Sequence, residues 1–196
     1  MGKLITIKIV KTMKNVTIAF ILMVSVLSFA QDQSNKKFQF GVSYSLTNDD
    51  EIFKNPFSGY ANYQVKKWNN LSLNAGLRVF YFGSKESANF SNKLGFNPNI
   101  STSYFFDKNK LIGNFGVGYY FDSFTSTPTI TGIIVSPKRD IKTNGITITP
   151  GLKYFFHPNI FIDANATFLM AKTKDNFYKD ITRNNTFINL GLGVAF

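Results

Sequence analysis

The sequence contains no cysteine and only one histidine among its 196 residues. Without cysteine, the chain cannot form a disulfide framework, use a thiolate or carry a lipid on an amino-terminal cysteine. A lone histidine makes a poor metal site. His157 lies beside Pro158 in a predicted turn, without the nucleophile and orienting group that Ser–His catalysis requires. We therefore expect no cofactor, no metal and no enzymatic activity.

Acidic residues are also scarce: 11 Asp and Glu stand against 22 Lys and Arg, which gives a net charge of +11. The first thirty residues hold four lysines and no acid, so the net charge falls from +11 to +7 without them. The remaining basic residues form no continuous stripe on a recognisable nucleic-acid-binding module. We expect no nucleic acid partner.

Long apolar runs are missing except near the amino terminus. Fifteen mostly apolar residues, Val16–Ala30, follow Lys14 and give way to polar residues at Gln31. A transmembrane helix needs roughly 20 apolar residues, so this run is too short to span a bilayer. A basic residue, a short apolar run and small residues at its end are instead typical of a secretory signal peptide.

The predicted cleavage site lies between Ala30 and Gln31. This division gives a signal peptide over residues 1–30 and one domain over residues 31–196. The sequence leaves open whether Met1 or Met13 is the true start.

From residue 37 onward, apolar and polar residues alternate with the period of a β-strand. In the segment 37–46, Phe38, Phe40 and Val42 share one face and Gln39 lies on the other. Across the chain, one face is rich in Leu, Ile, Val and aromatic residues, and the opposite face is rich in Asn, Ser, Thr, Gln and Gly. Most segments have about ten residues, the length that a tilted strand needs to cross a bilayer. The eight predicted strands are 37–46, 59–65, 71–82, 96–106, 111–122, 145–156, 160–170 and 186–196.

The predicted connections alternate between long and short. Bacterial outer-membrane barrels join their strands by short periplasmic turns and longer extracellular loops. A soluble barrel would turn its apolar face inward and has no reason to separate loop lengths in this way. The long predicted connections are 47–58, 83–95, 123–144 and 172–185.

The last predicted strand carries the most specific signal. Leu190, Leu192, Val194 and Phe196 share one apolar face, and the chain ends on that aromatic residue. This strand resembles the carboxy-terminal insertion signal of bacterial outer-membrane β-barrels. The pattern over residues 31–196 resembles the small OmpA/OmpX-type barrels. The predicted fold is therefore an all-β, eight-stranded antiparallel up-and-down transmembrane β-barrel, preceded by a cleavable signal peptide.

This resemblance implies a location in the outer membrane of a Gram-negative bacterium, with both chain termini in the periplasm. It implies contact with outer-membrane lipid and lipopolysaccharide, and insertion by the barrel-assembly machinery. Basic residues in the loops favour attraction to lipopolysaccharide, although a solvated loop surface would have the same composition.

Charged residues on the polar face should meet inside the barrel. If Pro158 centres a tight turn, Lys153 and Asp163 lie opposite each other in the lumen. Arg78 either joins this pair or contacts Asp122. We interpret the group as a salt-bridge network that offsets buried charge, with a charged gate as the alternative.

Eight strands enclose a space that side chains nearly fill, so we expect a plugged polar interior. Inward-facing glycines would make room there for large side chains such as Phe80, Tyr120 and Phe155. These glycines are Gly41, Gly76, Gly116, Gly118, Gly151, Gly191 and Gly193.

The predicted role is structural or interactive, with four extracellular loops available to a ligand that the sequence does not identify. The first alternative is a narrow channel or small-solute, porin-like protein. The second is a lipid-modifying enzyme, which would need a cluster of polar catalytic groups at the lipid-facing rim.

Overall fold

The computed structural model describes residues 36–48, 53–85, 90–106, 110–126, 129–131, 134–136, 138–176 and 180–196. The predicted signal peptide and its cleavage site, Ala30 and Gln31, lie outside these residues. Among the described residues, no helix is long and apolar enough to cross a bilayer.

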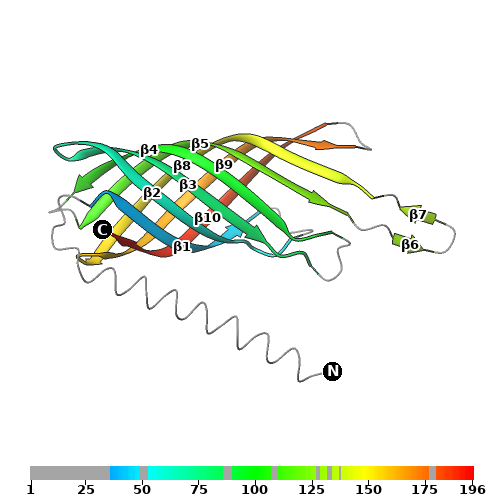
Figure 1. Ribbon diagram of the computed structural model, residues 1–196, viewed down its shortest axis with the longest axis horizontal. Helices are drawn as coiled ribbons and strands as arrows, with labels where there is room; N and C mark the ends of the chain where they lie inside the picture. The colour runs from blue at the N-terminus through cyan, green and yellow to red at the C-terminus, as the bar shows by residue number, and fades with distance from the viewer. Residues whose placement is uncertain are drawn as a thin grey trace, which may run out of the picture.

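Eight antiparallel strands form a closed barrel in the order β1-β10-β9-β8-β5-β4-β3-β2 (Figure 1). A separate two-stranded sheet, β6 and β7, lies beyond one end of the barrel. The strands are β1 (Phe38–Thr47), β2 (Phe57–Trp68), β3 (Leu71–Phe82), β4 (Lys93–Phe106), β5 (Leu111–Thr125), β6 (Thr129–Thr131), β7 (Ile134–Ser136), β8 (Asp140–His157), β9 (Ile160–Asp175) and β10 (Ile181–Ala195).

The first and last strands close the barrel. Their register runs from Gln39 opposite Ala195 to Thr47 opposite Phe187. Phe38 and Phe196 exchange two backbone hydrogen bonds of 2.9 Å. Closure removes the open sheet edge that would otherwise leave backbone groups unpaired in lipid.

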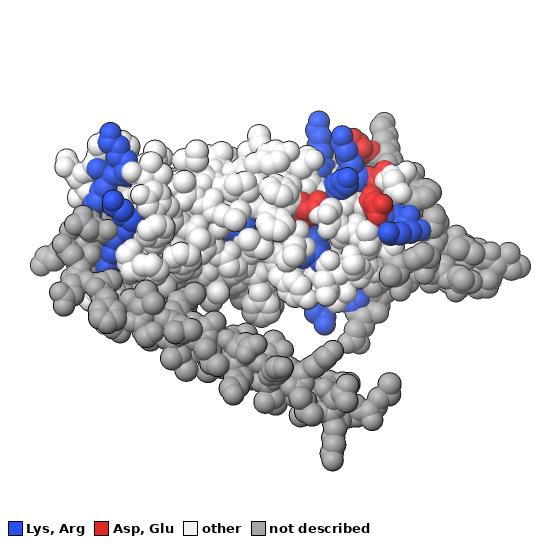
Figure 2. Space-filling view, in the orientation of Figure 1, with Lys and Arg blue, Asp and Glu red and all other residues white. Residues whose placement is uncertain are grey.

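Apolar side chains point out of the barrel, as the alternating pattern predicts. Leu152 and Leu190 are 53% and 59% exposed, whereas Lys153 and Asn189, next to them in the chain, are buried. Figure 2 shows the result as a broad uncharged band, with charged residues gathered at the two ends. An apolar outer belt with polar residues inside suits a barrel surrounded by lipid.

The connections differ in length at the two ends of the barrel. We call the end with the connections 48–56, 83–92, 126–139 and 176–180 the loop end, and the opposite end the turn end. The turn end has the short connections 69–70, 107–110 and 158–159 and holds Phe38 and Phe196.

Several strands are longer at the loop end than the sequence pattern predicts. β8 begins at Asp140 rather than residue 145, and β9 ends at Asp175 rather than residue 170. Ladder pairs such as Lys142 with Lys174 continue the barrel there. The apolar pattern ends where the lipid-facing belt ends, but backbone pairing continues through polar residues.

Candidate functional site

The lumen at the loop end contains a group of buried, mostly aromatic residues, which we call the loop-end cluster. The long connections contribute two of its rings: Phe53 bridges to Ser84, and Phe90 bridges to Ser126. Phe53 packs edge-on against Phe124 with ring centroids 5.0 Å apart. The cluster consists of Phe53, Phe80, Phe82, Tyr120, Phe124, Ile141, Leu169, Ala171 and Phe187, with Phe90 packed against them.

An ion pair lies within the loop-end cluster. Lys93 Nζ is 3.1 Å from Asp122 Oδ2, and the two side chains are 11% and 1% exposed. The ammonium group also lies 4.1 Å from the ring centroid of Phe82 and 4.7 Å from that of Phe53. Tyr120 donates a 2.6 Å hydrogen bond from its hydroxyl to Asp122. Asp122 is thus held by Lys93 and Tyr120, and it is not the partner of an arginine.

Sequence reasoning missed Lys93, because it assigned residues 83–95 to a loop. In the structure β4 begins at Lys93, which pairs with Phe82 and faces inward. Two-residue spacing from Lys93 through Gly95 to Asn97, all on the inner face, is the signal that could have identified it.

A smaller set of buried side chains, the turn-end cluster, occupies the lumen at the other end. Phe155 and Phe161 pack with ring centroids 5.0 Å apart. Glycines lie beneath two of its rings: a Cβ at Gly41 would come within 2.5 Å of the Tyr60 ring, and one at Gly193 within 2.3 Å of the Phe161 ring. The cluster consists of Tyr60, Ile112, Phe155, Phe161 and Ala195, with Phe105 packed against them.

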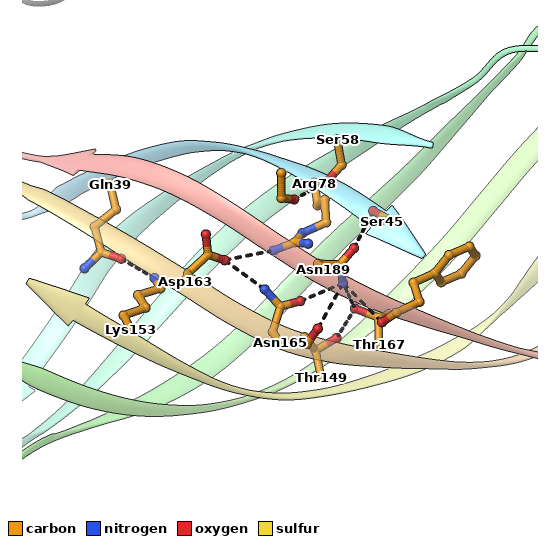
Figure 3. A network of polar contacts seen from close by, with 12 residues as sticks. Gln39, Ser45, Ser58, Arg78, Thr149, Lys153, Asp163, Asn165, Thr167 and Asn189 are labelled. Atoms are coloured by element: carbon orange, nitrogen blue, oxygen red, sulfur yellow. Dashed lines mark hydrogen bonds and ion pairs between the residues drawn. The ribbon is translucent and has the colours of Figure 1, made fainter. Parts of the chain in front are cut away.

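Between the two clusters the lumen is polar. Ser45 Oγ donates to Asn189 Oδ1 over 2.5 Å, Asn189 Nδ2 donates to Asn165 Oδ1 over 2.8 Å, and Asn165 Nδ2 donates to Asp163 Oδ2 over 2.8 Å. Figure 3 shows this series of bonds running along the lumen from β1 through β10 to β9. The series joins four inward positions on three neighbouring strands and ends on a carboxylate.

The predicted charged residues come together at this carboxylate. Lys153 and Asp163 lie opposite each other in the β8–β9 register. In the described part of the chain, however, Asp163 forms its ion pair with Arg78, at 3.9 Å. Lys153 instead donates a 2.5 Å hydrogen bond to Gln39 Oε1 across the lumen. The three charges therefore form one group, in which the shortest contact of Lys153 is to an amide.

The only histidine of the sequence lies at the turn between β8 and β9. His157 Nδ1 accepts a 3.3 Å hydrogen bond from the backbone N–H of Asn159 within the β8–β9 turn. Among the described residues, no group of three or more His, Cys, Asp or Glu is placed to hold a metal.

The terminal strand presents its predicted apolar face to the outside. Leu190 and Leu192 are more than half exposed. The ring of Phe196 stacks on Phe40 of β1, with centroids 5.5 Å apart. The residues of the predicted insertion signal therefore lie on the lipid-facing side, next to the seam between β1 and β10.

A model of the outer membrane protein β-barrel domain matches residues 16–196 of the chain. No curated protein sequence is similar to it. The chain is similar in fold to three small barrels of known structure. Neisserial surface protein A has a TM-score of 0.52 and 16% identity, and the match covers 82% of this chain and 97% of that one. The N-terminal β-barrel domain of Pseudomonas aeruginosa OprF has a TM-score of 0.53 and 12% identity, with 83% and 100% covered. Yersinia pestis Ail in complex with the heparin analogue sucrose octasulfate has a TM-score of 0.55 and 13% identity, with 82% and 99% covered.

Proposed function

We propose a scaffold role for this chain, which belongs to the outer membrane protein β-barrel family and is located in the bacterial outer membrane. The barrel is closed and rigid, and it presents its loop end at the cell surface. Its role is structural or interactive, and it neither conducts solutes nor catalyses a reaction. The signal peptide over residues 1–30 belongs to the same proposal, because the loop end can reach the cell surface only after export.

The filled lumen carries this proposal. Aromatic clusters occupy both ends, and polar side chains bond to one another between them. A cavity that the described residues leave at the centre has a volume of about 50 Å³. A water molecule needs about 10–15 Å³ by the same measure, so the cavity has room for only a few waters. The described side chains leave little room for a continuous aqueous path, which supports the closed lumen over the narrow channel.

Conductance in planar lipid bilayers tests the closed lumen. We expect the wild-type barrel to insert and remain silent, with a general porin inserted under the same conditions as the positive control. Steady single-channel conductance of the wild type would contradict the closed lumen and favour the channel.

Orientation can be tested because the native chain has no cysteine. Lys138 is exposed near the loop end and Lys66 is exposed near the turn end. We expect a membrane-impermeant maleimide to label Lys138→Cys on intact cells, and to label Lys66→Cys only after the outer membrane is permeabilised. If only Lys66→Cys is labelled on intact cells, the turn end lies at the cell surface and the proposed orientation is wrong.

Lipopolysaccharide is the partner that we propose for the outer rim of the loop end. Along the outer face of β9 the apolar belt ends at Met170, and the next two outward positions are Lys172 and Lys174. Lys142 of β8 lies directly opposite Lys174. Like charges in directly opposed positions repel each other, and a phosphate between them would relieve that repulsion. The three lysines lie just past the apolar belt, the level at which lipid headgroups begin.

Replacing these three lysines by Gln should weaken the stabilisation of the barrel by lipopolysaccharide. The control variant replaces Lys66, Lys67 and Lys110 at the turn end by Gln, which removes the same charge from the opposite end. Equal stabilisation of both variants by lipopolysaccharide in mixed micelles would refute the lysine site. The proposal also includes an extracellular ligand for the loops and insertion by the barrel-assembly machinery. This experiment does not test either of them.

A further inference from the structure

We propose that the central chamber of the lumen, which Arg78 and Lys153 line, holds a small monovalent anion of the size and charge of chloride. The ion would be structural, and it has no part in what the loops bind. The inference rests on the closed lumen of the proposed function, because a permanently hydrated channel would supply counterions without a site.

The charge balance of the chamber is the first argument. Among the described residues, the charged residues that are buried as a whole are Arg78, Asp122, Lys153 and Asp163. Asp122 is neutralised by Lys93 in the loop-end cluster. The chamber is left with two cations and one carboxylate, a net charge of +1. A buried charge without a counter-charge is strongly unfavourable, so such a group binds a counter-ion or gives up its charge.

Both cations lie near the same aromatic ring. The guanidinium carbon of Arg78 lies 4.9 Å from the ring centroid of Tyr60, and Lys153 Nζ lies 5.6 Å from the same centroid. Asp163 can offset only one of them, and its contact with Arg78 is 3.9 Å, longer than a hydrogen bond. The second positive charge therefore has no partner of opposite sign in the chamber.

Unused donors supply the second argument. Among the described residues, Arg78 Nη1 and the Tyr60 hydroxyl are buried without a hydrogen-bond partner, and so are two acceptors that line the same chamber, Asn114 Oδ1 and Asp163 Oδ1. Lys153 carries three N–H groups, and its hydrogen bond to Gln39 occupies one of them. Buried N–H and O–H groups normally find acceptors. Arg78, Lys153 and Tyr60 all line this chamber, and charged donors around one cavity are an arrangement that binds an anion.

The cavity supplies the third argument. Arg78, Tyr60, Lys153 and Asp163 all line the chamber of about 50 Å³ between the two clusters. This volume admits a halide but not a large organic anion. The carboxylate of Asp163 and the amides around it exclude a multiply charged anion, because a net charge of +1 can balance only a single negative charge.

Halide-dependent stability is the test. The wild-type barrel is refolded in sodium chloride or in sodium gluconate of the same ionic strength, and its unfolding is followed by heating. We expect the melting temperature to be higher in chloride by about 5 °C, the order expected when a bound ion stabilises only the folded state. Bromide should act like chloride, and crystals grown in bromide should show an anomalous peak in the chamber lined by Arg78 and Lys153.

Two variants shift the charge balance in opposite directions. Arg78→Gln makes the chamber neutral and should abolish the difference between chloride and gluconate. Asp163→Asn raises the net charge to +2 and should enlarge that difference. Lys66→Gln removes one positive charge from the exposed turn end and should behave as the wild type.

The proposal is overturned if the wild-type melting temperature is the same in both salts, or if bromide crystals show no anomalous peak in the chamber. The peak needs only the wild-type protein, so it decides the matter even if a variant fails to fold. Bilayer conductance of the same preparations separates the two proposals. A silent barrel without halide dependence refutes the anion alone, whereas a conducting barrel refutes the closed lumen.

Discussion

Breaking the Lys93–Asp122 ion pair should cost more stability than any other single substitution in the loop-end cluster. Lys93→Met keeps the length of the side chain but leaves the Asp122 carboxylate, which is 1% exposed, without its cation. Asp122 would then keep only the hydrogen bond from Tyr120. Removing one partner of a buried pair typically costs about 3–5 kcal/mol.

The opposite substitution should be milder. Asp122→Asn leaves an oxygen for the Tyr120 hydroxyl, and Lys93 keeps its contacts with the rings of Phe53, Phe82 and Phe124, at 4.1–5.3 Å. Lys93 is also slightly more exposed than its partner. A cation that keeps aromatic faces retains about 2 kcal/mol of favourable interaction when desolvated, so we expect a loss of roughly 1–3 kcal/mol.

The double variant identifies the cause. With Lys93→Met and Asp122→Asn together, the buried site carries no charge. The free energy of unfolding of the barrel should then return to within about 1 kcal/mol of the wild-type value. Unfolding in guanidinium chloride can be followed by fluorescence, because Trp68 is the only tryptophan in the chain. Losses that simply add in the double variant would show that the two charges do not interact, and the description of the cluster as an ion pair in an aromatic setting would be wrong.

Three further predictions test the packing, the lipid-facing surface and the terminal strand. Gly41→Val should destabilise the barrel by about 1–3 kcal/mol, because its Cβ would meet the Tyr60 ring at 2.5 Å. Gly59→Ala should change the free energy of unfolding little, because its Cβ would have no neighbour nearer than 3.9 Å. Equal losses of stability in chemical unfolding would contradict this packing. Leu190→Lys should cost about 2–4 kcal/mol if that position lies near the bilayer midplane, and a loss under 1 kcal/mol in lipid vesicles would place it elsewhere. Phe196→Ser should slow insertion by the assembly machinery without changing the fold of barrels already inserted, and unchanged insertion in pulse-chase assays would refute the predicted role of the terminal residue.

Sequence periodicity predicts the faces of this fold better than the ends of its strands. The segment 71–82 coincides with β3, and the inward and outward residues of the barrel strands follow from alternation, except after the register shifts at Gln64/Lys66 in β2 and Phe155/His157 in β8. Strand ends at the loop end were wrong by up to five residues. Hydrogen bonds between polar stretches such as 140–144 and 171–175 extend β8 and β9, and a pattern of apolar residues carries no information about them.

Gly95 shows why the loop-end cluster escaped sequence reasoning. A glycine near Pro98 reads as part of a loop, yet Gly95 is an inward strand position whose Cβ would lie 2.3 Å from the Tyr120 hydroxyl. Its small size makes room for a ring from the neighbouring strand. The prediction that inward glycines accommodate large side chains is confirmed for Gly41 and Gly193, which face the rings of Tyr60 and Phe161. It is wrong for the other five predicted glycines, whose nearest neighbours are smaller polar side chains or backbone atoms. Which side chain a glycine faces depends on contacts between strands.

Contacts across the lumen cannot be predicted from the pairing of neighbouring strands. The opposition of Lys153 and Asp163 follows from a turn at Pro158, because the two strands are consecutive and their register counts outward from the turn. The contact of Asp163 with Arg78 joins β9 to β3, and that of Lys153 with Gln39 joins β8 to β1. Strands that are not neighbours meet at heights set by the tilt and stagger of the closed barrel. The surplus positive charge of the chamber is therefore a property of closure: the sequence supplies two cations and a carboxylate, and the stagger brings all three to one level.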